Sequence, residues 1–280
     1  MSFYPLANLG DGFAGRRASG PGACVLWLHP YGLDSGCWGG LWDRLPDWRH
    51  VGVDLPGHGL SEPLPPRQDG PALVRRLREL AERQQARHLV GLSLGAGLAL
   101  ALGLDAPDGF ASLSLASPVI AGWPEVEPYW VRYRELANMY WMGGGFGAHL
   151  RGRMMLVEPS AFDGARTRPA LWDALWRTAG RHPFWDLSDA AYLRAASLPE
   201  PAPGTRVPPT LLLLGAEDAL GSAALVERLG AALGAGPALA LAGAAHLSLL
   251  EEPAAAAAAL REHLAANAGD AAGNPPGATA

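Results

Sequence analysis

The chain has 280 residues, of which 49% are hydrophobic and 18% are charged, and its formal net charge is −5. This length fits one α/β domain with an insertion, and the apolar content is enough for a large buried core. The acidic balance argues against nucleic acid as a partner, because proteins that bind it usually present a basic face. Two cysteines, Cys24 and Cys37, are too few for a disulfide framework and favour a reduced, cytoplasmic location.

Two segments bear on membranes and targeting. The first five residues lack the basic region and apolar stretch that are typical of a signal peptide. Residues 229–250 carry no Asp, Glu, Lys or Arg, and a run of this length could span a bilayer. However, the run consists mostly of Ala and Gly, and Gly236-Pro237 interrupts it. We therefore expect a helix end, a turn and a short buried strand there, and no membrane partner.

Short apolar segments alternate with longer amphipathic segments along most of the chain. The short segments are apolar on both faces, which is typical of central strands in a parallel sheet covered by helices. The predicted strands are 23–28, 50–54, 88–91, 112–116, 210–214 and 238–241. The predicted helices are 71–85, 94–104, 222–233 and 253–266. This alternation predicts an α/β fold with a mostly parallel central sheet flanked by helices.

The alternation stops between residues 119 and 208, which contain no clear strand. We interpret 119–208 as a helical cap insertion between two parts of the core, 1–118 and 209–268. Residues 269–280 have the composition of a disordered tail. Six of the ten tryptophans fall in the insertion, and we expect them to bind substrate, although such residues also pack on cores. They are Trp123, Trp130, Trp141, Trp172, Trp176 and Trp185.

The strongest local motif is Gly91-Leu92-Ser93-Leu94-Gly95, which follows a predicted strand and precedes an apolar helix. In that context G-x-S-x-G predicts a nucleophile elbow, with the serine hydroxyl exposed at the edge of the sheet. The helix that follows would direct its N-terminal N–H groups at the reacting centre. The alternative is a glycine-rich turn that contains an ordinary serine.

A serine nucleophile needs a base, because its hydroxyl is weakly nucleophilic at neutral pH. Of the eight histidines, His246 alone lies between the last predicted strand and the last predicted helix. The chain order Ser, acid, His then places the acid after strand 210–214, where we expect Asp218 to orient the imidazole. Glu217 is the competing carboxylate, and either acid could instead cap the next helix.

The reaction also needs N–H donors for an oxyanion. One donor should be the backbone of Leu94, beside the nucleophile. The other should come from the loop His29-Pro30-Tyr31-Gly32 after the first predicted strand. Proline has no N–H, so Tyr31 is the expected donor. The alternative is that this loop only turns the chain.

Taken together, these segments resemble the α/β-hydrolase superfamily. The resemblance runs in chain order from the His29 loop through Asp54-Leu55-Pro56-Gly57-His58-Gly59 to the elbow and the two C-terminal segments. It implies that His58 is a turn residue. The segment from Ala245 to Ser248 is followed by Glu252-Pro253 and looks like the enol-lactonase and carboxylesterase branch. This chain departs from the superfamily pattern in having His-Pro where most members have His-Gly.

The resemblance implies a serine hydrolase that needs no cofactor or metal. The expected reaction is cleavage of a carboxylic ester, lactone or thioester of a small apolar or aromatic molecule through an acyl-enzyme on Ser93. Two alternatives remain open. One is a ligand-binding module of the same fold with little turnover, and the other is a cofactor-free peroxidase or C–C bond hydrolase that uses the same triad. The sequence leaves the oligomeric state open.

Overall fold

The structure is a computed structural model that describes residues 4–64, 70–120, 122–125, 161–179, 197–220 and 223–269. Three of the predicted cap tryptophans lie outside the described residues, as does the predicted tail apart from Gly269. These tryptophans are Trp130, Trp141 and Trp185.

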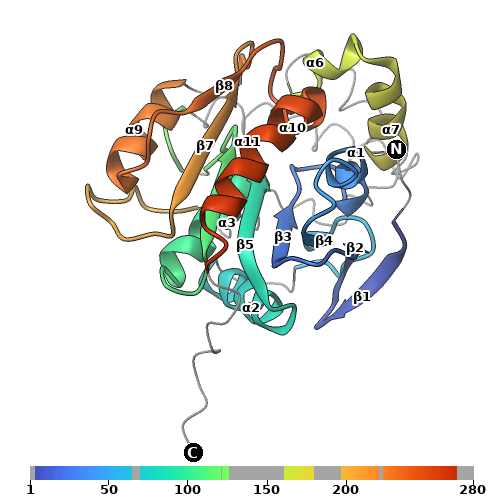
Figure 1. Cartoon of the computed structure of the whole chain (residues 1–280), viewed down its shortest axis with the longest axis horizontal. Coiled ribbons are helices and arrows are strands. Elements are labelled where there is room, and N and C mark those ends of the chain that lie inside the picture. The colour runs from blue at the N-terminus through green and yellow to red at the C-terminus, as the bar shows by residue number, and fades with distance from the viewer. Residues whose placement is uncertain are drawn as a thin grey trace, which may run out of the picture.

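An eight-stranded sheet forms the centre of the molecule, in the order β1-β2-β4-β3-β5-β6-β7-β8 (Figure 1). Strands β3 to β8 pair in parallel, while β1 and β2 form an antiparallel edge. The strands are β1 (Leu6–Gly10), β2 (Phe13–Ala18), β3 (Cys24–Leu28), β4 (Arg49–Val53), β5 (Ala86–Leu92), β6 (Ser112–Ala116), β7 (Thr210–Gly215) and β8 (Leu239–Leu241). The predicted α/β fold with a mostly parallel sheet is confirmed.

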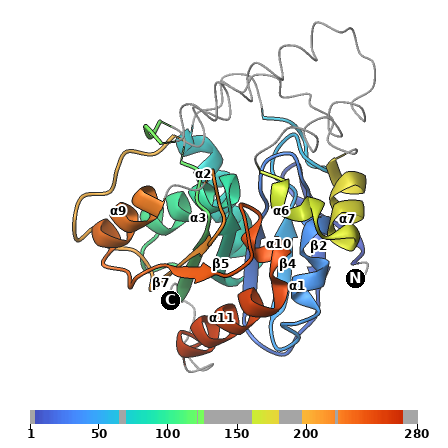
Figure 2. The same ribbon diagram turned by 90° about the horizontal axis from the view of Figure 1, so that it is seen from above.

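Helices cover both faces of the sheet. They are η1 (Ser35–Trp38), α1 (Gly39–Trp42), α2 (Gly70–Arg83), α3 (Leu94–Asp105), α6 (Asp163–Arg166), α7 (Pro169–Ala179), α9 (Ala223–Leu233), α10 (Ser248–Glu251) and α11 (Pro253–Ala266). Figure 2 shows α3 and α9 on one side of the sheet and α11 on the other, with α6 and α7 near α1 and α10. Two apolar clusters follow from this arrangement, one on each face.

Strand β3 shows how the sequence divides between the two clusters. Leu26 and Leu28 point to the face covered by α2, α3 and α9, whereas Val25 and Trp27 point to the opposite face. All four side chains are fully buried. Successive strand residues alternate between faces, so a strand buried on both sides must be apolar throughout. This is why the central strands were predictable from short apolar runs.

The hairpin β1–β2 was not predicted. Its first strand is half-exposed at the sheet edge, and its second carries Arg16 and Arg17, so neither has a continuous apolar run. A tight turn at Gly10-Asp11-Gly12 joins them, with all three residues at positive φ.

Among the described residues, no helix is long and apolar enough to cross a membrane.

Buried histidines make the stability of this fold sensitive to pH. The Trp27 indole N–H donates to His50 Nδ1 over 3.0 Å, and His50 Nε2 lies 2.7 Å from the carbonyl of Leu45. Because Nδ1 accepts a hydrogen bond from the Trp27 indole, Nε2 carries the ring proton and the imidazole is neutral. The Trp42 ring stacks on this imidazole at 5.3 Å. Burial lowers the pKa of His50 from 6.5 to about 4.

We therefore expect the free energy of unfolding to fall as the pH is lowered from 6.5 to 4. In this window the unfolded chain binds a proton at His50 that the folded protein excludes, so protonation favours unfolding. A shift of this size corresponds to roughly 3 kcal/mol. Urea unfolding measured at intervals across the window should give a shallower pH slope for His50→Gln than for the wild type. Equal slopes would contradict the prediction.

Candidate active site

Ser93 occupies a strained turn between β5 and α3. Its backbone has φ 57° and ψ −119°, a conformation that residues with a side chain rarely adopt. Hydrogen bonds from neighbouring segments hold it: Ser93 N donates to Ala116 O at 2.9 Å, and Val119 N donates to Ser93 O at 3.1 Å. Strain of this kind persists only where the surroundings enforce it, and it clusters at functional sites.

The two glycines of the motif are required because other backbone segments approach both positions closely. A Cβ on Gly91 would lie 2.3 Å from Gly95 O, and a Cβ on Gly95 would lie 2.0 Å from Leu28 O. The elbow can therefore be this tight only because both positions lack a side chain. The contact at Gly95 also places the first turn of α3 directly against the start of the His29 loop.

The structure brings Ser93, His246 and Asp218 together from three different strand ends. Ser93 Oγ lies 2.9 Å from His246 Nε2, and His246 Nδ1 lies 3.2 and 3.1 Å from the two carboxylate oxygens of Asp218. A carboxylate only accepts hydrogen bonds, so Nδ1 carries the proton and Nε2 accepts from the serine hydroxyl. The three groups form one continuous hydrogen-bonded chain.

The segments that carry the base and the acid pack closely on one another. Asp218 follows β7, and its side chain is fully buried. A Cβ on Gly215 would lie 2.0 Å from Ala245 O, so the loop that carries His246 crosses β7 where no side chain intervenes. The competing carboxylate, Glu217, is exposed, and its backbone N–H donates to Ala244 O. The geometry therefore favours Asp218 over Glu217 as the partner of His246.

The loop predicted to carry an oxyanion donor is held by His29. His29 Nε2 accepts from Leu55 N at 2.9 Å, so Nδ1 carries the proton and donates to Pro30 O at 2.8 Å. Burial lowers the pKa of His29, which favours this neutral form. A trans peptide directs its N–H opposite to its carbonyl. Because Pro30 O points at His29, the Tyr31 N–H points away from it, toward the other side of the loop.

The described tryptophans of the predicted insertion occupy two different places. Trp123 is 4% exposed within the core cluster on the α3 face, where its indole donates to Leu198 O. Trp172 and Trp176 lie on α7, 5.9 Å apart, and pack against the other cluster. Helix α7 also contacts η1, which follows the Tyr31 loop. A substrate-binding role for these tryptophans stays a prediction.

A carboxylate that the sequence analysis passed over lies beneath the His246 loop. Glu251 is the last residue of α10, and its side chain is fully buried. It accepts the backbone N–H groups of Ala245 and Leu247, the neighbours of His246. The available signal in the sequence was a glutamate five positions after the expected base, directly before Glu252-Pro253.

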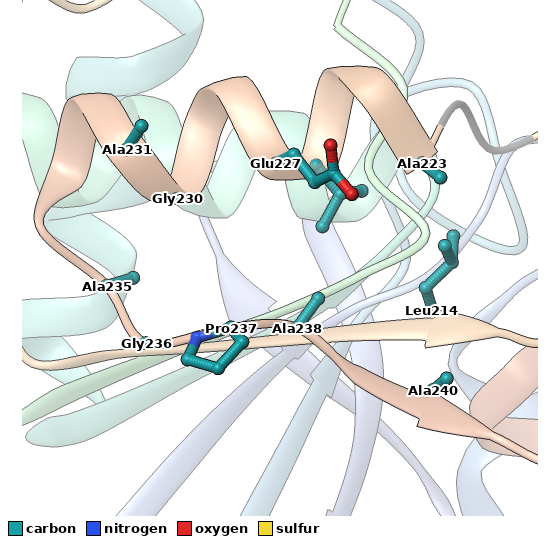
Figure 3. Close-up of a pocket in the computed structure, with 11 residues that line it drawn as sticks. Leu214, Ala223, Glu227, Gly230, Ala231, Ala235, Gly236, Pro237, Ala238 and Ala240 are labelled. Atoms are coloured by element: carbon teal, nitrogen blue, oxygen red, sulfur yellow. The ribbon is translucent and has the colours of Figure 1, made fainter.

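A separate hollow of about 320 Å³ lies between α9 and β8. Figure 3 shows its lining, which consists of small apolar residues and one charged residue, Glu227. Among the described residues that line it there is no serine, cysteine or histidine. Glu227 supplies a carboxylate there, but the described part of the lining has no serine–histidine pair like that at Ser93.

Two known proteins match part of this chain in sequence. The chain is 37% identical over 124 residues to the dihydrolipoyllysine-residue acetyltransferase component of an acetoin cleaving system from Cupriavidus necator, covering 41% of this chain and 32% of that protein. It is 36% identical over 120 residues to a pimeloyl-[acyl-carrier protein] methyl ester esterase from Methylococcus capsulatus, covering 40% and 45%. The matches thus span less than half the length of these relatives.

Structural similarity extends over nearly the whole chain. A thermophilic esterase from Thermogutta terrifontis superposes with a TM-score of 0.73 at 23% identity, covering 91% of this chain and 95% of that one. The model of the family described as alpha/beta hydrolase matches residues 25–260, which include Ser93, Asp218 and His246. The chain therefore belongs to the alpha/beta hydrolase family.

Proposed function

We propose that this protein is a serine esterase that uses Ser93 as nucleophile, His246 as general base and Asp218 as the residue that orients the base. The observation that carries the proposal is the continuous chain from Ser93 Oγ through His246 to Asp218. The tautomer is the one the chemistry needs, because Nε2 is free of a proton on the side of the serine. The similarity to an esterase of Methylococcus capsulatus supports the same reaction class.

The reaction would run in two halves. Ser93 Oγ attacks the substrate carbonyl while its proton moves to His246 Nε2, and the carbonyl oxygen becomes an oxyanion. The C–O bond to the leaving group then breaks, and the imidazolium returns the proton to the departing alcohol. Water, deprotonated by His246, attacks the acyl-enzyme, and the acid leaves as Ser93 regains its proton.

The oxyanion would be bound by two backbone donors. Leu94 N is the first N–H of α3, a helix of 12 residues, and its position next to Ser93 favours negative charge there. Tyr31 N would supply the second donor, from a loop whose start packs on Gly95. Both are backbone groups, so they are held by the fold and need no rearrangement during the reaction.

The proposed substrate class rests on the same site and on the predicted insertion. We propose a carboxylic ester, lactone or thioester of a small apolar or aromatic molecule, and a cap formed by residues 119–208. Support comes from α7, which places Trp172 and Trp176 of the insertion on the side of η1 and the Tyr31 loop. A panel of p-nitrophenyl esters and lactones with different acyl chains would define the preference.

We expect a fluorophosphonate probe to modify Ser93 and no other residue. The probe reacts with serines activated by an adjacent base, and Ser93 is such a serine. Intact-mass measurement should show one added probe on the wild type and none on Ser93→Ala. Ser114→Ala is a matched control, because Ser114 is buried in β6 and its hydroxyl has no hydrogen-bond partner in the part of the chain that the structure describes. An unmodified wild type, or a modified Ser93→Ala, would overturn the assignment.

A further inference from the structure

The loop that carries His246 rests on one carboxylate. Glu251 Oε2 accepts the N–H of Ala245 at 2.6 Å, and Oε1 accepts the N–H of Leu247 at 3.1 Å. These are the residues immediately before and after His246. The two oxygens of one side chain therefore hold the backbone N–H groups of both neighbours of the residue whose imidazole must reach Ser93.

This carboxylate is enclosed by the insertion. The backbone of Gly164, in α6, lies so close that a Cβ there would be 2.0 Å from Glu251 Oε2. Arg168 lies beside it, with Nη1 4.0 Å from the same oxygen. The Arg168 guanidinium also donates to Gly243 O at 2.7 Å and to Glu252 Oε1 at 2.6 Å. Gly164 and Arg168 thus contact Glu251, and Arg168 also contacts the loop that leads to His246.

Burying a carboxylate here is costly. Burial raises the pKa of Glu251, while the two N–H donors, Arg168 and His246 act in the opposite direction. A well-packed apolar residue of similar volume would often be as stable or more so at such a place. A buried, fully hydrogen-bonded acid whose two bonds flank the base is therefore better explained by the orientation it imposes than by stability alone.

We propose that Glu251 is a positioning residue for His246, and that Gly164 and Arg168 of the insertion hold Glu251 in place. The inference rests on the proposed function, since it assigns Glu251 to the same acyl-transfer site. It also gives the predicted insertion a second role besides covering the site. The position of residues 164–168 would then determine how the imidazole of His246 is aligned with Ser93. Misplacement of a reacting group by about 1 Å can cost about 100-fold in rate.

The first test replaces the carboxylate. Glu251→Gln keeps the shape but offers one acceptor oxygen and an NH₂ group that would oppose one of the two N–H donors. Because the His246 imidazole would be misaligned with Ser93, we expect kcat to fall about 10- to 100-fold. KM should stay within about twofold of the wild type. The rate of fluorophosphonate labelling should fall by the same factor. Glu251→Gln with wild-type kcat would overturn the proposal.

The second test moves Glu251 without replacing it. Gly164→Ala puts a methyl group against the carboxylate, while alanine has the higher helix propensity, so α6 itself should not be weakened. We expect a loss of kcat of about 10-fold, and little further loss when it is combined with Glu251→Gln, because both act through one contact. The control is Gly236→Ala, where a Cβ would meet nothing within 4 Å. Independent, multiplying losses would contradict the proposal.

A third readout needs no turnover. In protein labelled with ¹⁵N-histidine, the Nδ1–H proton of His246 hydrogen-bonded to Asp218 should give a low-field signal, identified by its loss in His246→Gln. We expect Glu251→Gln and Gly164→Ala to broaden or shift this signal, and Gly236→Ala to leave it unchanged. Failure of the wild type to label with fluorophosphonate would defeat the proposed function, whereas an unchanged Nδ1–H signal in Glu251→Gln would defeat the positioning role.

Discussion

Replacing Ser93 or His246 by alanine is expected to lower kcat by roughly four to six orders of magnitude, as in other hydrolases that use this arrangement. The two side chains share one hydrogen bond, and the proposed mechanism needs both of them for the same proton transfer. Without the imidazole, the serine proton has no acceptor. Without the hydroxyl, the imidazole has nothing to activate except water. The two single variants should therefore be impaired to similar extents.

The double variant Ser93→Ala/His246→Ala separates this mechanism from two independent contributions. If the residues act as one unit, the double variant should be about as slow as either single variant. Steady-state kinetics with a p-nitrophenyl ester, with thermal melting as a check on folding, would measure this. Ser114→Ala, a loss of a buried hydroxyl elsewhere in the sheet, should retain wild-type kcat. A double variant far slower than both single variants would contradict a shared mechanism.

The central part of the fold could be read from the sequence because burial on both faces leaves a clear pattern. Strand β6 and helix α11 begin and end where the sequence predicts, at Ser112–Ala116 and Pro253–Ala266. The β1–β2 hairpin could not be read in this way. It lies at the sheet edge, where exposed positions and Arg16 and Arg17 interrupt the apolar pattern, and β pairing there depends on tertiary contact with β4.

The residues of the candidate site also fall into two groups. Some can be predicted from the local sequence, whereas others come together only through tertiary contacts. Ser93 could be predicted because the elbow needs glycine at two fixed positions, which the sequence records directly. The contact between Asp218 and His246 depends on the crossing of two loops above Gly215, and only the order of segments pointed to it. Glu251 and Arg168 are 83 positions apart, and no local pattern relates them before the chain is folded.

The choice of acid gives the second large expected effect. Asp218→Asn keeps the size of the side chain but removes its charge, and asparagine can donate as well as accept. Facing His246 Nδ1, an amide NH₂ would favour the tautomer with the proton on Nε2, which then points at Ser93 Oγ and cannot accept its proton. We expect kcat/KM to fall by up to about 10⁴-fold at neutral pH.

Glu217→Gln is the matched control, because it makes the same chemical change one position away. Glu217 is exposed, and its contact with the His246 loop is made by its backbone N–H to Ala244 O, which the substitution leaves intact. We expect this variant to have wild-type kcat/KM and to label with fluorophosphonate at the wild-type rate. Asp218→Asn should label much more slowly, because phosphonylation also requires the base. If Glu217→Gln were the damaging change and Asp218→Asn harmless, the hydrogen bonds from His246 Nδ1 to Asp218 would not be the ones that orient the base.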